Sequence, residues 1–483
     1  MASLSSTPRP FRAKRLLPVL LIAALAGCAS VGPDYRAPAS VAPAAWQAVP
    51  LDGMLTGSPA NLSRWWEQLS DPLLSSLIDD ALLANPDLKS AAAALRGARA
   101  SRDLASANRF PTVNASSGVT RSTSLGAART LYQAGFDASW EPDVFGGTRR
   151  ALEAADADLE ASLADLRSTR VSLVAEVALN YVELRAFQAR LAIARNNLES
   201  QSETLQITDW RAQAGLVSAL DVEQARSNRD TTRAQVPALD TGRAGAEHRL
   251  AILVGKTPGS LHARLDAPGA GRLPALPASV ALRIPAEALR QRPDVQAAER
   301  RLAAETARVG QAEAARYPSF SLSGSIGLEA LGLSTLTGGG QIARSLAGAV
   351  SGPVFDAGRL RARVEAQDAL REQTLAAYDK AVLTALEEVQ NALVALANSR
   401  ERQQALSSAA DAARNAALLA RHRYSSGLID FQTVLSTERS LLTIEDSLAS
   451  AEAERVTALI QLYKALGGGW SPDGTTQSTG KAS

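Results

Sequence analysis

The chain has 483 residues, of which 46% are hydrophobic and only 4% aromatic, and its formal net charge at pH 7 is +2. This near-neutral balance argues against a nucleic-acid-binding protein, which normally carries clustered Lys and Arg. The histidines are isolated from one another, a single Cys is present, and no P-loop, G-x-S-x-G or G-x-G-x-x-G motif occurs. We therefore expect no enzyme activity and no bound metal or other cofactor.

The first 27 residues have the layout of a lipoprotein signal peptide. A basic segment is followed by the apolar run Leu16–Leu25 and then by small residues. This run is about half of the ~20 residues that a membrane-spanning helix needs. Leu25–Cys28 resembles the bacterial lipobox, in which the chain is cut before an acylated Cys. We expect residues 1–27 to be removed and Cys28 to carry a diacylglycerol thioether and an N-acyl chain. The alternative is an ordinary signal peptide with an accidental Cys.

An anchor segment (28–72) and a predicted helix (73–109) lead to the first of two regions with period-two alternation. These regions, 110–145 and 317–356, each predict two β-strands with one apolar and one polar face. The alternating stretches are Thr112–Thr120, Tyr132–Trp140, Phe320–Leu328 and Ile342–Val350, and Arg344 interrupts the apolar side of the last. Each is near the ~10 residues of a tilted transmembrane strand. We expect aromatic side chains of these strands to lie at membrane interfaces, namely Tyr132, Phe136, Trp140 and Phe320. The alternative is a soluble four-stranded sheet packed on helices.

Each strand region is followed by a predicted helical hairpin, over 146–256 and 357–466. The runs Thr148–Ala214 and Arg359–Ser426 contain no Gly or Pro. Runs of this length with apolar residues every three or four positions are typical of coiled coils. Gly215 and Gly427 end these runs and predict the hairpin tips. The second return arm is unbroken, whereas the first is predicted to be interrupted at Pro237, Gly242 and Gly245.

The remaining segments are a Gly- and Pro-rich linker (257–284), a helix (285–316) and a polar tail (467–483). The chain also repeats its landmarks, since Asn85–Leu88 corresponds to Arg292–Val295 and the two tip sequences correspond to each other. We therefore predict an internal duplication of about 210 residues.

Four strands are too few to close a membrane barrel. Bacterial membrane barrels start at about eight strands, and an open sheet edge in lipid would leave backbone groups without hydrogen-bond partners. Several copies must then share one barrel. A dimer would supply eight strands and a trimer twelve, and the sequence pattern alone does not choose between them.

Six motifs resemble those of the outer-membrane efflux lipoproteins, which are relatives of TolC in tripartite pumps of the resistance-nodulation-division type. They are VGPDYRAP (Val31–Pro38), SWEPDVFGGTRR (Ser139–Arg150), EVALNYVELR (Glu176–Arg185), LRQRPDVQAAERRL (Leu289–Leu302), PVFDAGRLRA (Pro353–Ala362) and YKALGGGW (Tyr463–Trp470). The resemblance implies a mainly α homotrimer with a membrane β part, in which a twelve-stranded transmembrane barrel is continued by a long periplasmic α-helical barrel. The segments 28–72 and 257–284 would belong to an irregular equatorial belt.

The resemblance also implies a function and partners. The protein would be a lipid-anchored outer-membrane channel that extends into the periplasm and passively conducts drugs or other small toxic compounds. Its partners would be its own copies, a periplasmic adaptor (membrane fusion protein), an inner-membrane pump and outer-membrane lipid. Two alternatives are the exit duct of a type I protein secretion system and a lipid-anchored periplasmic coiled-coil tether without a pore.

The resemblance places two functional regions at the hairpin tips. The adaptor-contacting residues would be Gly215, Leu216, Val217, Ser218, Gly427, Leu428, Ile429 and Asp430. Both glycines also fit simple helix-terminating turns. The periplasmic gate would involve Gln432, Ser436, Arg439 and Asp221. Ser436 occupies the position of an acid in relatives, so Glu438 or Asp430 could substitute for that acid, or neutral contacts could hold the closure. Asp221 and Arg439 are candidates for ion pairs between hairpins.

Overall fold

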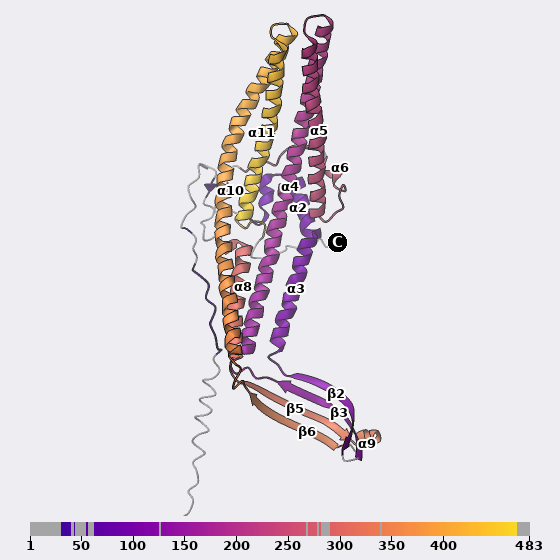
Figure 1. Ribbon diagram of the computed structural model, residues 1–483, viewed down its shortest axis with the longest axis vertical. Coiled ribbons are helices and arrows are strands. Elements are labelled where there is room, and N and C mark those ends of the chain that lie inside the picture. Colours follow the sequence, from indigo (N-terminus) through magenta and orange to yellow (C-terminus); the bar gives the residue numbers. More distant parts are fainter. Residues whose placement is uncertain are drawn as a thin grey trace, which may run out of the picture. The chain divides into compact units, whose positions relative to one another are not determined.

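The computed structural model describes residues 30–39, 43, 55–56, 62–124, 127–266, 269–277, 280–281, 290–338 and 341–470 (Figure 1). The chain divides into two compact units. The first comprises the chain up to Ala39, Ala94–Leu163 and Ala297–Asp379, and the second comprises Ser40–Ala93, Ala164–Gln296 and Lys380–Ser483. Cys28, the sequence before it and the tail after residue 470 lie outside the described residues.

The first unit contains one antiparallel four-stranded sheet in the order β2-β3-β5-β6. Its strands are β2 (Thr112–Ser124), β3 (Ala127–Trp140), β5 (Ser319–Ala330) and β6 (Gln341–Ser351). Each predicted strand region therefore holds two strands, and the period-two interpretation is confirmed. The short helix α9 (Leu333–Gly338) between β5 and β6 was not predicted.

The strand register separates apolar from polar residues. On one face, Phe136 of β3 lies opposite Ala115 of β2 and Ile326 of β5. On the other face, Asp137 lies opposite Asn114 and Ser325. The apolar face is uncovered, because Phe136 is 59% exposed and Ile326 is 51% exposed. We call these two surfaces the apolar face and the polar face of the sheet.

The helices that precede the first strand region are shorter than predicted. One helix was expected over 73–109, but the structure has α2 (Pro72–Ala84) and α3 (Pro86–Ala107), preceded by the 3-10 helix η2 (Leu62–Leu69). The break occurs at Asn85, whose Oδ1 accepts the backbone N–H groups of Asp87 and Leu88 at 2.8 and 3.0 Å. This cap starts a new helix, and Pro86 fits its first position because no N–H is needed there. The corresponding helix of the second half is α8 (Pro293–Ala314).

Two long helical hairpins form most of the remaining chain. In the first, α4 (Gly147–Gln213) is followed by α5 (Ala219–Leu253). In the second, α10 (Arg359–Ser425) is followed by α11 (Phe431–Ala465). The two long arms have 67 residues each and the two return arms have 35 each. None of the helices in the described part of the chain has an apolar stretch long enough to cross a membrane.

The predicted interruption of the first return arm is wrong, because α5 continues through Pro237. Buried residues lie on both sides of the proline, including Thr232 and Ala246, so packing holds the helix together across the missing hydrogen bond. Gly242 serves close packing instead of a break, since an added Cβ would lie 2.4 Å from Phe187 Cε1.

The largest core lies in the second unit and is built around aromatic side chains. Trp65 of η2 stacks on Tyr463 of α11 with ring centroids 5.1 Å apart. Tyr181 of α4 donates to Asp71 Oδ2 at 2.8 Å, and the other carboxylate oxygen of Asp71 caps α2. Smaller elements complete the fold, namely α6 (His262–Leu265) and the parallel pair β1 (Leu55–Thr56) and β4 (Val280–Ala281).

Candidate functional site

The first hairpin turns at Gly215, which has a φ of +73°. The N–H of Leu216 donates to Arg211 O at 2.8 Å and that of Gly215 donates to Ala212 O at 2.9 Å. These bonds satisfy carbonyl groups at the end of α4, and the left-handed conformation suits glycine. Ser218 and Asp221 then start α5 with a reciprocal capping box.

The second hairpin repeats this turn. Gly427 has a φ of +75°, and the N–H of Leu428 donates to Arg423 O at 2.8 Å. Asp430 caps α11 by accepting the N–H of Thr433 at 2.8 Å and its hydroxyl at 2.6 Å. The bonds from the Thr433 hydroxyl and backbone lower the pKa of Asp430 below its usual value. The turns therefore provide the geometry that both glycines were predicted to supply.

The predicted tip residues include two prominent apolar side chains. Leu216 is 68% exposed and Leu428 is 74% exposed. The next residues along each turn, Val217 and Ile429, are half-buried. At each tip, a leucine exposed to solvent therefore follows a turn that hydrogen bonds hold in place. Such an arrangement is expected of a small surface that contacts another protein.

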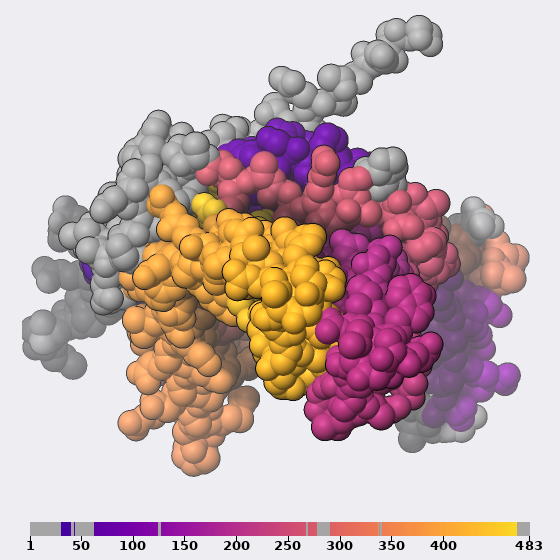
Figure 2. Space-filling view, turned by 90° about the horizontal axis from the view of Figure 1, so that it is seen from above, coloured from indigo at the N-terminus to yellow at the C-terminus, as the bar shows by residue number. Residues whose placement is uncertain are grey.

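Below the turns, the two hairpins are joined by side chains that the sequence did not identify. The Arg211 guanidinium of α4 lies over the Tyr424 ring of α10 at 4.4 Å and donates to Tyr424 O. The Tyr424 hydroxyl donates to Thr208 Oγ1 at 3.3 Å. Arg421 of α10 donates to Ser200 of α4. Figure 2 shows the second hairpin, orange to yellow, directly beside the magenta first hairpin.

Glu438 belongs to this hairpin contact and not to an exposed acidic ring. Its side chain is buried, and its Oε1 accepts a hydrogen bond from Thr204 Oγ1 at 2.7 Å. Burial raises the pKa of Glu438, while the bond from Thr204 and the charge of Arg421 act in the opposite direction. The suggestion that Glu438 could substitute for the missing gate acid is therefore wrong for this arrangement, because its carboxyl group points between the hairpins.

The predicted gate residues of α11 share one exposed face. Gln432, Ser436 and Arg439 are all exposed and follow one another at steps of four and three residues. The Arg439 Nε donates to Asn228 Oδ1 of α5 at 3.0 Å. Asp221 is used by the capping box, where its Oδ2 accepts the N–H and the hydroxyl of Ser218 at 3.0 and 2.9 Å. Within the described chain, Asp221 and Arg439 therefore bind different partners.

The polar face of the sheet carries a continuous row of hydrogen-bonding groups. Ser116 and Asn114 donate to the Asp137 carboxylate at 3.3 and 3.4 Å. Further along this face, Gln133 Nε2 donates to Glu329 Oε1 at 3.1 Å. Such a face is compatible with water and contrasts with the uncovered apolar face.

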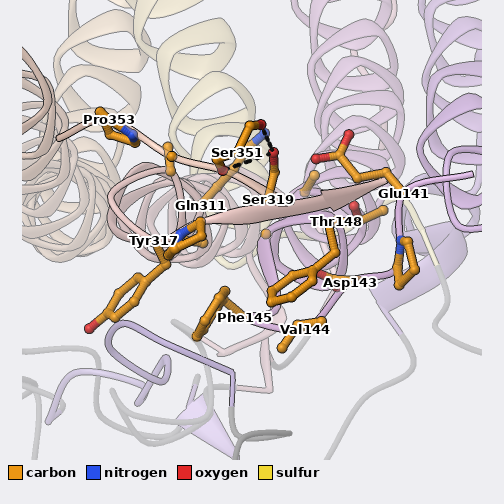
Figure 3. A pocket seen from close by; sticks show the side chains of 18 of the residues that line it. Glu141, Asp143, Val144, Phe145, Thr148, Gln311, Tyr317, Ser319, Ser351 and Pro353 are labelled. Carbon is orange, nitrogen blue, oxygen red and sulfur yellow. Dashed lines mark hydrogen bonds between the residues drawn. The ribbon is translucent and has the colours of Figure 1, made fainter. Parts of the chain in front are cut away.

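Aromatic side chains gather where the strands meet the helices of the first unit. Phe145 stacks on Tyr317 with centroids 4.7 Å apart and lies 6.3 Å from Phe320. Trp140 Nε1 donates to Arg109 O at 3.0 Å. A cavity of about 690 Å³ opens beside this cluster, and Figure 3 shows Phe145 and Tyr317 together with Glu141 at its wall. Glu141 and Phe145 lie in the segment between β3 and α4, and Tyr317 lies just before β5.

The segment that follows Cys28 is held against the same region by a buried arginine. Arg150 of α4 donates to Asp34 Oδ1 at 2.7 Å and to Val31 O and Gly32 O at 3.2 Å each. Gly32 approaches Gly310 of α8 so closely that an added Cβ would lie 2.3 Å from the Gly310 Cα. The motifs pointed to these segments, but only the fold shows that they meet.

Histidines and acids do not cluster into a metal site anywhere among the described residues. His262 Nδ1 lies 3.2 Å from Glu247 Oε2, and the same carboxylate oxygen lies 3.4 Å from the Arg243 guanidinium.

Comparison with known proteins identifies the relatives of this chain. The profile of the outer membrane efflux protein family matches residues 77–256 and 284–468. Nodulation protein T of Rhizobium leguminosarum bv. trifolii is 32% identical over 93% of this chain and 96% of its own length. The solvent efflux pump outer membrane protein SrpC of Pseudomonas putida is 34% identical over 94% of this chain and 98% of its own length. Outer membrane protein OprJ of Pseudomonas aeruginosa is 32% identical over 93% and 95%, respectively.

Solved structures agree with these relatives. The outer-membrane channel OprN has 39% identity and a TM-score of 0.85, covering 92% of this chain and all of that one. CusC has 27% identity and a TM-score of 0.80, covering 91% of this chain and all of that one. The resemblance drawn from the sequence motifs is thus confirmed. The chain belongs to the outer membrane efflux protein family, and its similarity to nodulation protein T, outer membrane protein OprJ and the outer-membrane channel OprN agrees with this.

Proposed function

We propose that three copies of this chain close a single twelve-stranded barrel in the outer membrane. The observation that carries the proposal is the four-stranded sheet, in which β2 and β6 each have one unpaired edge within the chain and the apolar face is uncovered. Unpaired backbone groups are costly in lipid, so membrane sheets close on themselves. Four strands are too few to close, and the resemblance to TolC relatives favours twelve over eight.

In this barrel the apolar face meets lipid and the polar face lines a water-filled lumen. Trp140 and Phe320 lie near the strand ends that lead to the helices, whereas Tyr132 lies near the opposite ends, where it pairs with Val119 and Ala330. We assign the first two to the inner membrane interface and Tyr132 to the outer one. Phe136 lies between these levels on β3.

The helical hairpins of the three copies would form a helical barrel in the periplasm. The equal lengths of α4 and α10, and of α5 and α11, support an origin by internal duplication. The apolar and polar residues that join α4 to α10 and α11 provide contacts between neighbouring hairpins, as a wall of parallel hairpins requires.

As an outer membrane efflux protein, the chain is the outer-membrane component of a tripartite pump, working with a periplasmic adaptor and an inner-membrane pump. We assign the adaptor contact to the two tips, Gly215–Ser218 and Gly427–Asp430. The exposed Leu216 and Leu428 support this assignment, because each stands beyond a rigid turn and is available to a partner.

The closure of the channel at the tips is assigned to Gln432, Ser436 and Arg439. They share an exposed face of α11, and only Arg439 carries a charge among them. With Glu438 buried and Asp430 engaged as a helix cap, the proposed closure depends on polar and cationic contacts instead of an aspartate ring.

The proposed anchor is a lipid on Cys28, which the lipobox-like sequence supports. Two or more acyl chains bind a membrane far more durably than one. The bonds of Arg150 to Val31 and Gly32 support a defined exit of the anchor segment near the Phe145–Tyr317 cluster.

The proposed cargo is drugs or other small toxic compounds, which move passively because the inner-membrane pump supplies the energy. Relatives carry names such as solvent efflux pump and antibiotic efflux pump outer membrane proteins. A deletion strain should accumulate a fluorescent dye more than its parent, and the cloned chain should restore export. Unchanged dye levels with impaired protein export would favour the type I secretion alternative, and absence of any conductance in planar bilayers would favour the tether.

The gate assignment has its own test in the same bilayers. Replacing Gln432, Ser436 and Arg439 by alanine should raise the resting current of the purified channel, because the polar contacts that hold the closure are removed. Substituting the exposed Glu401 of α10 is the matched control and should leave the current unchanged. An unaltered current in the triple variant would remove these residues from the closure.

A further inference from the structure

Arg344 is a charged residue in the middle of apolar neighbours. It lies on β6 opposite Ile326, in the row that continues through Phe136 to Ala115. Its side chain is exposed and forms no hydrogen bond or ion pair with any residue that the structure describes. A guanidinium group remains charged at any physiological pH, so this position requires an anion or water.

No carboxylate on the four strands can supply that anion. The acids of these strands are Asp137 and Glu329, and both lie on the polar face. Asp137 accepts bonds from Ser116 and Asn114, and Glu329 accepts one from Gln133. A second copy of the chain brings the same strands with the same faces, so its sheet offers no acid to Arg344 either.

The position of Arg344 along β6 indicates which part of the membrane it reaches. It is the fourth residue of the strand, close to Gln341 and far from Ser351, after which the chain returns to α10. At ~3.4 Å per residue, Arg344 is about 10 Å from Gln341 along the strand. Because membrane strands tilt by about 40° from the membrane normal, Arg344 lies about 8 Å deeper in the membrane than Gln341. A long arginine side chain can extend over such a distance to place its charge at the interface.

We infer that Arg344 binds the phosphate of a lipid headgroup in the outer leaflet of the outer membrane, at one site per copy. This inference rests on the proposed barrel, in which the apolar face meets lipid. The planar guanidinium matches phosphate with two parallel hydrogen bonds, and a charge left unpaired on the lipid face is strongly unfavourable. The ligand offsets that penalty, which explains why the apolar pattern of β6 tolerates an arginine.

Arg121 provides an internal comparison. It lies on the apolar face of β2, opposite Thr130 and two residues beyond Val119, at the end of the sheet remote from α4 and α10. At this end its side chain reaches water without a lipid partner. The phosphate contact is therefore assigned to Arg344, and loss of Arg121 should have the smaller effect.

The test uses the purified full-length protein in phosphatidylcholine nanodiscs supplemented with bisphosphorylated lipid A or with its dephosphorylated form. Native mass spectrometry should show lipid A retained by the wild-type particle, with an apparent affinity about tenfold weaker in Arg344→Gln, as expected for loss of a charge-assisted bond. Arg344→Lys should retain part of the binding because it keeps the charge. Arg121→Gln should bind within a factor of about three of wild type.

Three results would overturn the assignment: equal retention by Arg344→Gln and wild type, equal retention of the dephosphorylated lipid, or complete displacement by inorganic phosphate, which would indicate a free-anion site. Planar-bilayer conductance of the same preparations tests the proposed channel separately from the lipid site. Conducting channels without phosphate-dependent binding contradict the lipid site alone, whereas wild-type protein that fails to conduct contradicts the proposed channel.

Discussion

At the scale of single residues, Glu438 is a carboxyl group enclosed between two hairpins. Because burial raises its pKa above the usual value of 4.5, the folded protein binds a proton more tightly than the unfolded chain. Stability should therefore fall as the pH rises from the usual value through the raised pKa. A glutamine at position 438 does not ionise, so the Glu438→Gln variant does not lose this stability as the pH rises. The melting temperature of the variant minus that of wild type should therefore increase between pH 4 and pH 8.

Differential scanning calorimetry of both proteins across this pH range provides the measurement. Glu401→Gln is the matched control on the exposed side of α10, and its difference from wild type should not change with pH. A melting-temperature difference for Glu438→Gln that stays constant, or declines with rising pH, would show that Glu438 is not held in a desolvated site.

Tyr424 allows the ring and the hydroxyl group to be tested separately. Tyr424→Phe removes only the 3.3 Å bond to Thr208 and should reduce the local opening free energy by about 1 kcal/mol or less. Tyr424→Ala also removes a buried ring that packs on Phe431 and against the Arg211 guanidinium. This substitution should reduce the same opening free energy by about 3–5 kcal/mol. Native-state hydrogen exchange in the last turns of α4 and α10 would measure both. Equal exchange in the two variants would contradict a packed hairpin contact.

These residue-level contacts could not be predicted from the sequence. Arg211 and Tyr424 are separated by more than 200 positions, and neither occurs in a motif with a defined partner. The tip turns could be predicted because Gly215 and Gly427 act locally, through the left-handed conformation that each supplies. Glu438 shows the limit most clearly, since helical spacing alone does not reveal whether an acid faces solvent or a neighbouring hairpin.

At the scale of elements, two helical glycines have opposite surroundings. Gly97 of α3 has open space where a Cβ would be placed, whereas a Cβ at Gly310 of α8 would lie 2.9 Å from Arg150 Nε. Gly97→Ala should therefore stabilise the protein by about 0.5–1 kcal/mol through helix propensity. Gly310→Ala should lose this gain, because it displaces Arg150 and the segment Val31–Asp34.

Limited proteolysis distinguishes the two variants. Cleavage near Arg36 should become faster in Gly310→Ala and stay at the wild-type rate in Gly97→Ala, since only the first substitution disturbs the docked segment. If both variants are cleaved at the same rate, Arg150 and Gly310 do not hold that segment.

The long elements were predicted well because their signals are local. The uninterrupted runs Thr148–Ala214 and Arg359–Ser426 agree with α4 and α10 to within a residue at each end. The interruption expected at Pro237 was wrong because tertiary packing outweighed one lost hydrogen bond. The short elements α9 and η2 span only six and eight residues, too few for a periodic pattern to predict a helix.

At the scale of the whole molecule, the account depends on closure of the sheet. One chain supplies β2, β3, β5 and β6, with free edges on β2 and β6. Pairing the β6 edge of one copy with the β2 edge of the next satisfies both rows of backbone groups. The same closure places Asp137 and its neighbours in the lumen and the apolar face against lipid, so conduction, localisation and the lipid contact of Arg344 all follow from it.

The most direct measurement is the mass of the particle extracted from outer membranes in mild detergent, determined by native mass spectrometry. The account predicts three copies of the mature, acylated chain in one particle that conducts ions after transfer to planar bilayers. A particle of one or two copies, or a chain that remains monomeric and water-soluble without its acyl groups, would contradict it.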